Sequence, residues 1–343
     1  MPWLDYVFLK NPLRRIMDSG ATGAVAQFAR ARLAERLQLL ESSTQTDGTA
    51  GGHKDFLTRF LDAKKTYPQV VTDQQVFSYT LSNVNAGSDT TAISLRAVLY
   101  YTLKNPKVLQ RLNEELRGAR RQGRLSLPAQ WKETQELPYL DAVIKEALRL
   151  HPAVGLLLER VVPSSGLQLP DGPFLPAGTI VGVNPWVIHR HDCFGANVDS
   201  FHPERWLQRP EESREAFEAR KQVMNGATYT FGAGPRTCIG KNISLLEIYK
   251  LIPSLLCTFK VSVERSDKAL CRMIDESHIC GLNLAFTSTH TAPLFLPPKS
   301  LAYRLIALLS SEQIELDKPE ADWQTWNAWF VGQTGMDVKL SRL

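Results

Sequence analysis

The chain is poor in the features that mark several common protein classes, and each shortage excludes one class. Only five cysteines occur in 343 residues and none forms a CxxC pair, so neither a disulfide framework nor a zinc ribbon is expected. Reduced thiols suit a chain that faces the cytosol. No run of about 18 apolar residues is present, and the N-terminal segment lacks the charged start and apolar stretch of a signal peptide. We therefore expect neither a spanning helix nor a secretory leader in this sequence.

The chain also has only a small excess of positive over negative charge. The chain has 40 basic and 35 acidic residues, a net of +5, and the whole excess lies in one segment. Residues 104–124 hold seven basic side chains against Glu114 and Glu115, namely Lys104, Lys107, Arg111, Arg117, Arg120, Arg121 and Arg124. A uniformly basic coat is missing, so we predict no nucleic-acid partner. The basic segment is either a solvated helix face or a docking surface for an acidic partner.

The composition that remains is typical of a globular protein with a sizeable core, since 43% of the residues are hydrophobic and 22% are charged. Apolar residues recur at helical spacing in six segments: 14–40, 53–67, 72–103, 105–121, 137–150 and 242–259. Between Leu156 and Val187, short apolar runs alternate with Pro and Gly, which predicts small strands and turns. Because helices and strands do not alternate, the predicted fold class is mainly α with a minor β-sheet.

The most informative segment is FGAGPRTCIG, residues 231–240, directly before the last predicted helix. Its glycines allow close backbone approach, so that amide groups can turn toward a ligand or a sulfur. Cys238 would lie near a helix N-terminus, where free N–H groups favour a thiolate, and Arg236 adds a cation nearby. A thiolate of this kind is what an axial iron ligand in a porphyrin site requires. A glycine-rich turn around a buried cysteine is the plainer alternative.

Two other loop chemistries fail on specific residues. A phosphate-binding GxxxxGK[ST] loop would need glycine at position 235 and Ser or Thr at position 242, where this chain has Pro235 and Asn242. A phosphatase-like C-x5-R loop would need arginine where Ser244 stands.

The segment FGAGPRTCIG resembles the heme-binding signature F-x-x-G-x-R-x-C-x-G of the cytochrome P-450 family at every fixed position. The resemblance implies the C-terminal part of that fold, with Cys238 as the axial ligand of heme iron. The residues implied to bind heme are Cys238, Phe231, Gly232, Gly234, Arg236 and Gly240, together with Arg160 ahead of a predicted strand. Arg160 and Arg236 would each pair with a heme propionate.

Three further motifs follow the order of that family. Glu146 and Arg149 share a helix face at i and i+3 and could form an ordinary surface ion pair. They also resemble the family's E-x-x-R helix, where both residues bond a third arginine. The segment FHPERW supplies that arginine as Arg205 and resembles the P-E-R-F motif. The resemblance implies a buried structural triad of Glu146, Arg149 and Arg205 with no chemical role.

The segment NAGSDTT, residues 85–91, lies inside the long predicted helix. By default, a threonine in a helix bonds back to a carbonyl one turn earlier. The segment resembles the family's A-G-x-D-T-T element, which implies two catalytic residues: Thr90 would hydrogen-bond dioxygen at the iron, and Asp89 would relay protons toward it.

His189 and His191 form an H-x-H pair that could suggest a mononuclear metal site. No third His or Glu follows at a suitable spacing, and the segment resembles the H-R-D stretch of the same family. We therefore predict no metal site there.

The resemblance implies a heme-thiolate monooxygenase that inserts one atom of dioxygen into a small apolar substrate. Electrons would come from NADPH through NADPH–cytochrome P-450 reductase, and the basic segment could dock it. The sequence of residues 77–91 and 241–255 resembles that of fungal microsomal members, notably the pisatin-demethylase-like group. This resemblance suggests a role in secondary metabolism or detoxification. Two alternatives stay open: a truncated, non-catalytic fragment with weak or no heme binding, and a thiolate-heme isomerase or dehydratase that needs no reductase.

The chain departs from the family at both ends. Cys238 falls early, so we predict that residues 1–343 form a single partial domain without the family's N-terminal half. A full-length member would sit on the cytosolic face of the endoplasmic reticulum membrane, and membrane association is expected only through that missing half. Residues 259–263 predict a strand after the cysteine helix, continued by residues 316–331. Between them, residues 264–314 show no periodicity and are predicted to be an atypical insertion or translated intron.

Overall fold

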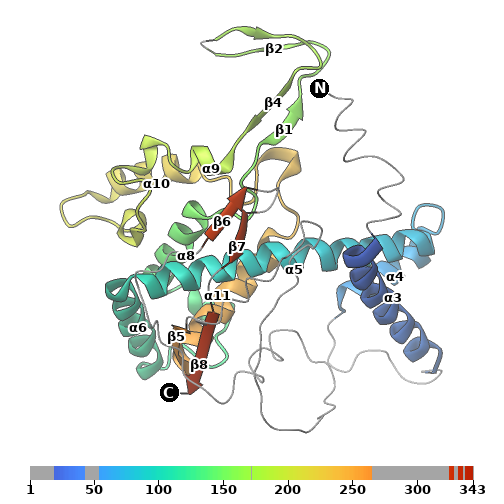
Figure 1. The fold of residues 1–343 in the computed structure, drawn as a ribbon, viewed down its shortest axis with the longest axis horizontal. Helices are drawn as coiled ribbons and strands as arrows, with labels where there is room; N and C mark the ends of the chain where they lie inside the picture. The colour runs from blue at the N-terminus through green and yellow to red at the C-terminus, as the bar shows by residue number, and fades with distance from the viewer. Residues whose placement is uncertain are drawn as a thin grey trace. The chain divides into compact units, whose positions relative to one another are not determined.

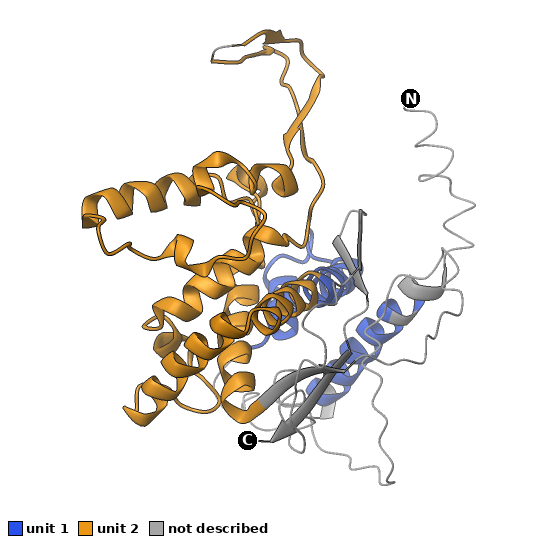
Figure 2. Cartoon of the chain, turned by 60° about the vertical axis from the view of Figure 1, so that its left-hand side comes forward, with its two compact units in different colours: residues 1–89, 268–295 blue, residues 90–267, 296–343 orange. Residues whose placement is uncertain are grey.

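The computed structural model describes residues 19–42, 54–170, 172–264, 324–327, 331–334 and 337–342. The chain divides into two compact units, residues 1–89 with 268–295 and residues 90–267 with 296–343 (Figure 2). The long helix α5 (Asp73–Lys104) crosses the division, so Asp89 closes the first segment of one unit and Thr90 opens the other. The single partial domain expected for the chain stays a prediction.

The first unit contains α3 (Ser19–Ser42), α4 (Phe56–Thr66) and the first half of α5. Asp55 caps α4 by accepting a hydrogen bond from the backbone nitrogen of Thr58 at 2.8 Å. Arg36 of α3 donates to the Thr58 hydroxyl at 2.6 Å, which ties the two helices together. The helices expected at 53–67 and 72–103 are confirmed, with their ends within a few residues of the predicted ones.

The second unit is built around α6 (Pro106–Arg121), α8 (Pro138–Leu150) and α11 (Lys241–Thr258), with the second half of α5 and the short α7 (Trp131–Thr134) (Figure 1). Both α6 and α8 begin with proline, whose missing N–H is not needed in a first helical turn. Their apolar faces bury one shared core that includes Val98, Leu112, Leu140, Ile144, Ile248 and Ile252. These helices confirm the mainly helical fold class.

The minor β-structure also appears where it was expected. Strand β1 (Leu158–Val161) pairs antiparallel with β4 (Ile180–Val183), and β2 (Leu167–Gln168) pairs with β3 (Phe174–Leu175). In Figure 1 these strands project from the helices of the second unit. Shorter elements follow: α9 (Pro185–Ile188), η1 (Asp192–Phe194), η2 (Pro203–Trp206), α10 (Arg214–Gly226) and η3 (Gly234–Arg236).

The strand predicted after the cysteine helix is confirmed as β5 (Phe259–Glu264). It pairs antiparallel with β8 (Asp337–Arg342), in a register that runs from Phe259 opposite Arg342 to Glu264 opposite Asp337. A second pair joins β6 (Gln324–Asn327) to β7 (Val331–Thr334). The predicted insertion at 264–314 lies outside the described residues except for Glu264, and so does most of the continuation expected at 316–331. None of the helices within the described ranges combines the length and hydropathy needed to cross a membrane.

Candidate functional site

Cys238 lies in a loop between α10 and α11 whose backbone is closed by its own hydrogen bonds. The Cys238 N–H donates to the carbonyl oxygen of Phe231 at 2.8 Å, and the Cys238 carbonyl accepts from the backbone nitrogen of Lys241 at 3.2 Å. The short turn η3 is closed by the Thr237 N–H, which donates to Gly234 at 3.0 Å. The loop therefore holds the backbone of Cys238 from both sides.

Three glycines let this loop form. Gly232 and Gly234 have φ angles of 70° and 66°, in the left-handed region that favours glycine over residues with a side chain. Gly240 has an ordinary backbone, but a Cβ there would lie 3.8 Å from the sulfur of Cys238. Gly240 thus leaves one flank of the thiol without a side chain.

The thiol itself is exposed, as is the neighbouring Ile239. Cys238 lies two residues before Gly240, which is the N-cap of α11. The carbonyl oxygen of Gly240 accepts hydrogen bonds from the backbone nitrogens of Ile243 and Ser244 at 3.0 Å each. An exposed thiol at a helix N-terminus is placed to act as a thiolate ligand.

The residues around Cys238 are compatible with a heme. Among the described residues, no group of three or more His, Cys, Asp or Glu side chains could hold a metal ion. In a heme the porphyrin supplies most of the iron ligands, so a single protein thiolate suits that group. Phe231 is half-buried against the core at the base of the loop, and the side-chain-free flank at Gly240 suits a flat macrocycle.

The two arginines expected near heme propionates lie on or beside this loop. Arg160 of β1 reaches the carbonyl oxygen of Ala233 with its Nη2 atom at 3.5 Å, so the strand and the loop lie next to each other. Arg236 is exposed within η3. Both guanidinium groups are therefore accessible to an anionic ligand, and their role toward a propionate stays a prediction.

Glu146 joins the two arginines that were expected around it. Arg149 donates to its carboxylate from Nε at 2.9 Å and Nη2 at 2.8 Å, and Arg205 donates from Nε at 3.2 Å. The Trp206 indole and the His202 backbone nitrogen complete the shell at 2.9 Å and 3.1 Å. Burial raises the pKa of Glu146, but the hydrogen bonds and charges of the arginines outweigh it and leave the pKa lowered.

The side chains of this triad are buried, with exposed fractions of 0% for Glu146 and Arg149 and 4% for Arg205. The structure differs from the expectation in one detail, because the carboxylate bridges the two guanidinium groups instead of both residues bonding the third arginine. Two cations cannot donate to each other, whereas one carboxylate can accept from both.

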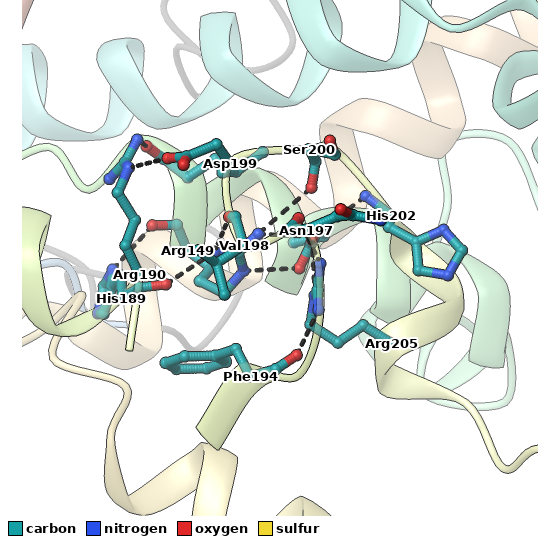
Figure 3. Close-up of polar contacts among 12 residues, drawn as sticks. Arg149, His189, Arg190, Phe194, Asn197, Val198, Asp199, Ser200, His202 and Arg205 are labelled. Carbon is teal, nitrogen blue, oxygen red and sulfur yellow. Dashed lines mark hydrogen bonds and ion pairs between the residues drawn. The ribbon is translucent and has the colours of Figure 1, made fainter. Parts of the chain in front are cut away.

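The remaining donors of the two arginines fasten the irregular chain that follows α9 (Figure 3). Arg149 donates to the carbonyl oxygens of His189 and Val198, both at 2.7 Å. Arg205 donates to carbonyl oxygens of residues 194, 196 and 197, the latter two at 3.0 Å and 3.2 Å. Backbone carbonyl groups in a segment with little regular secondary structure thus receive hydrogen bonds from buried side chains.

Asp89 and Thr90 lie on α5 on either side of the division between the units. Both are half-buried, and burial raises the pKa of the Asp89 carboxyl. Thr91 Oγ1 lies 3.0 Å from the hydroxyl of Ser244 in the first turn of α11, so the second half of α5 is fastened just beyond the cysteine loop. The placement of Asp89 toward Cys238 stays a prediction.

Sequence reasoning missed the roles of Thr91 and His189. Thr91 adjoins the expected Thr90 in the same motif but makes the contact between helices. His189 was considered only as half of an H-x-H pair, yet both of its ring nitrogens are hydrogen-bonded, to Arg149 and Tyr229. The His191 ring accepts from the backbone of Cys193 at 3.2 Å. Both histidines therefore make structural hydrogen bonds, and the absence of a metal there stays a prediction.

A mainly helical unit with an exposed cysteine just before a helix N-terminus is compatible with a heme-thiolate class of fold and site. The Cytochrome P-450 family model matches residues 1–279, and the chain belongs to the cytochrome P-450 family. It is 44% identical over 269 residues to cytochrome P-450 monooxygenase cicH of Emericella nidulans, covering 78% of this chain and 51% of that protein.

Two further relatives have a similar level of identity to this chain. A cytochrome P-450 monooxygenase of Aspergillus terreus is 42% identical over 278 residues, which are 81% of this chain and 54% of that protein. Pisatin demethylase of Fusarium vanettenii is 43% identical over 224 residues, 64% of this chain and 40% of that enzyme. The chain spans about half the length of the curated relatives it matches.

Proposed function

We propose that the protein to which this chain belongs is a heme-thiolate monooxygenase that inserts one atom of dioxygen into a small apolar substrate. The observation that carries the proposal is the loop at Cys238, which holds an exposed thiol at a helix N-terminus with a glycine flank beside it. When bound, heme would supply the activation of dioxygen. Relatives named as fungal monooxygenases support the same reaction class.

The residues of this chain would divide the work around that group. Cys238 would hold the iron, while Gly232, Gly234 and Gly240 would leave space for the ring and Arg160 and Arg236 would pair with its carboxylates. Asp89 and Thr90 would hold and pass protons on α5. Burial raises the pKa of Asp89, which favours its protonated form more than in an exposed carboxyl.

The electron donor is proposed to be NADPH, acting through NADPH–cytochrome P-450 reductase. Helix α6 buries Val108, Leu112, Leu116 and Ala119 and so turns its basic residues outward. Some of these residues are engaged: Arg111 bonds Glu204 at 2.8 Å and Arg120 reaches the carbonyl of Cys257 at 3.3 Å. Lys107, Arg117 and Arg121 are the proposed docking residues for an acidic partner, and reversing their charge should raise the KM for reductase.

Two elements of the proposal concern the cellular setting. The full-length protein would lie on the cytosolic face of the endoplasmic reticulum membrane, attached through a segment outside this chain. Its substrate would belong to fungal secondary metabolism or detoxification, in keeping with the resemblance to pisatin demethylase.

A spectrum tests the proposal directly. The chain is expressed with heme, reduced and exposed to carbon monoxide, and a strongly red-shifted Soret band is expected. Cys238→Ser should lose this band, while the matched variant Cys193→Ser, at a half-buried cysteine in η1, should keep it. A chain that binds no heme would contradict the proposal and favour a non-catalytic fragment. Turnover that needs no reductase would favour an isomerase or dehydratase.

A further inference from the structure

One buried side chain connects the end of α8 to the entry of the cysteine loop. His189 directly follows α9, and its ring is fully buried. Its Nδ1 atom lies 2.9 Å from the carbonyl oxygen of Arg149, and its Nε2 atom lies 2.8 Å from the backbone nitrogen of Tyr229. Figure 3 shows the ring of His189 close to Arg149.

These two contacts fix the tautomer of the ring. The N–H of Tyr229 can only donate, so Nε2 of His189 must accept and the ring hydrogen must lie on Nδ1. Nδ1–H then donates to the Arg149 carbonyl. Burial lowers the pKa of His189 to about 4, aided by the nearby charges of Arg149 and Arg190 and opposed by the bond to the Arg149 carbonyl. The neutral ring is therefore the form present at neutral pH.

The bond to Arg149 belongs to a set that closes the last turn of α8, where carbonyl groups lack partners within the helix. The Leu148 carbonyl accepts from the hydroxyl of Thr230 at 3.4 Å, and the Leu150 carbonyl accepts from Nη2 of Arg190 at 3.2 Å. Two of these hydrogen bonds involve residues at the start of the cysteine loop. Thr230 makes one of them directly. His189 makes another, and its ring also accepts from the backbone of Tyr229. The helix that carries the triad is thereby fastened to that loop.

From Tyr229 the connection continues through the backbone to the cysteine. The Tyr229 carbonyl accepts from the Gly232 N–H at 3.0 Å, which closes the first turn of the loop. The Phe231 carbonyl within that turn accepts from the Cys238 N–H at 2.8 Å. Short hydrogen-bonded steps thus lead from His189 to the residue that bears the thiol.

We propose that His189 is the positioning residue that fixes the cysteine loop on α8 and so sets the orientation of Cys238. It acts through Tyr229 and does not itself touch the thiol or a substrate. The inference rests on the proposed function only for the identity of the ligand that Cys238 takes.

Two substitutions test the two hydrogen bonds of the His189 ring separately. In His189→Asn the short amide can replace Nδ1 but does not reach Tyr229, whereas in His189→Gln the longer amide can accept from Tyr229. Hydrogen exchange of peptides that cover residues 229–241 is measured in the heme-free chain. His189→Asn should raise exchange in these peptides about tenfold, while His189→Gln should stay near the parent chain. His202→Asn, at a histidine whose side chain is 58% exposed, is the matched control and should change nothing.

Unchanged exchange in His189→Asn would overturn the proposal, and so would equal loss of protection in the Asn and Gln variants. Because this measurement needs no heme, it remains decisive if the proposed function fails. In the heme-loaded chain, the red-shifted Soret band of the reduced carbon monoxide complex should weaken in His189→Asn and persist in His189→Gln.

A measurement on the parent chain covers the case in which the Asn variant does not fold. Nitrogen-15 labelling of histidine reports which ring nitrogen carries hydrogen, and the signal of His189 is assigned by its absence from His189→Gln. A protonated Nδ1 and a bare Nε2 at neutral pH are expected. The opposite tautomer would overturn the proposal.

Discussion

The triad around Glu146 and the loop around Cys238 lie in the same unit but are completed in different ways. Glu146 is fully buried, and its oxygens accept from Arg149, Arg205, Trp206 and the backbone of His202. Cys238 has a hydrogen-bonded backbone but an exposed sulfur. The described residues of this chain complete the triad, whereas they leave the sulfur of Cys238 exposed.

This difference distinguishes residues that stabilise the fold from a residue that is proposed to bind a ligand. A buried carboxylate is costly unless it is paired, so removing a partner is felt throughout the triad. An exposed thiol contributes little to stability and is available for chemistry. The predictions below test that contrast in order of decreasing effect.

The largest loss is expected for Glu146→Gln, which leaves two buried guanidinium groups without a carboxylate. The free energy of unfolding should fall by about 3–5 kcal/mol. Urea unfolding followed by circular dichroism measures this change. The control is Glu218→Gln, at an exposed residue 3.4 Å from Lys221, which should shift stability by no more than about 0.5 kcal/mol. Similar losses in both variants would contradict the contrast.

Lowering the pH should reduce the stability that comes from the hydrogen bonds of neutral His189 between α8 and the cysteine loop. The pKa of His189 is about 4 in the folded chain, below its ordinary value of 6.5, so the unfolded chain takes up this proton first. The stability that depends on the neutral ring is therefore complete above about pH 6.5 and is lost as the pH falls toward 4, by about 3 kcal/mol in total. Urea unfolding at a series of pH values should show this decline. His189→Gln should flatten it, and an equally steep decline in that variant would assign it to other groups.

A smaller effect is expected where α5 meets α11. Thr91→Val keeps the shape of the buried side chain but removes its hydrogen bond to Ser244. The loss should be about 1 kcal/mol, because Ser244 is only half-buried and can turn to water. Thermal unfolding measures it, with Ser88→Ala on an exposed part of the same helix as the control. A Thr91→Val chain as stable as Ser88→Ala would show that this bond fastens nothing.

The smallest effect on stability is expected for Cys238→Ser in the heme-free chain. The sulfur is exposed and its loop is held by backbone hydrogen bonds, so the free energy of unfolding should change by less than about 0.5 kcal/mol. Urea unfolding alongside Glu146→Gln gives the direct comparison. A loss as large as that of Glu146→Gln would mean that the thiol supports the fold itself.

Sequence reasoning reached the parts of this structure that depend on local patterns. Helical spacing predicted α6, α8 and α11, and the motif around Cys238 predicted the loop before α11. It did not predict α10, a largely polar helix that buries only Met224.

The parts that sequence reasoning missed depend on contacts between distant segments. The carbonyl groups that Arg149 satisfies lie 40 and 49 residues along the chain, and their positions follow from packing. The same holds for His189, whose two partners each lie 40 residues away on either side. Nothing in the H-x-H spacing indicates a buried ring with a fixed tautomer.

The pairing of β5 with β8 has a consequence for how the chain length can vary. The two strands meet although 72 residues lie between Glu264 and Asp337. The entropy of closing such a span grows only with the logarithm of its length, so halving it would change the closure free energy by about 0.6 kcal/mol. A change in the number of residues between the two strands would therefore alter the closure entropy of this strand pair only slightly.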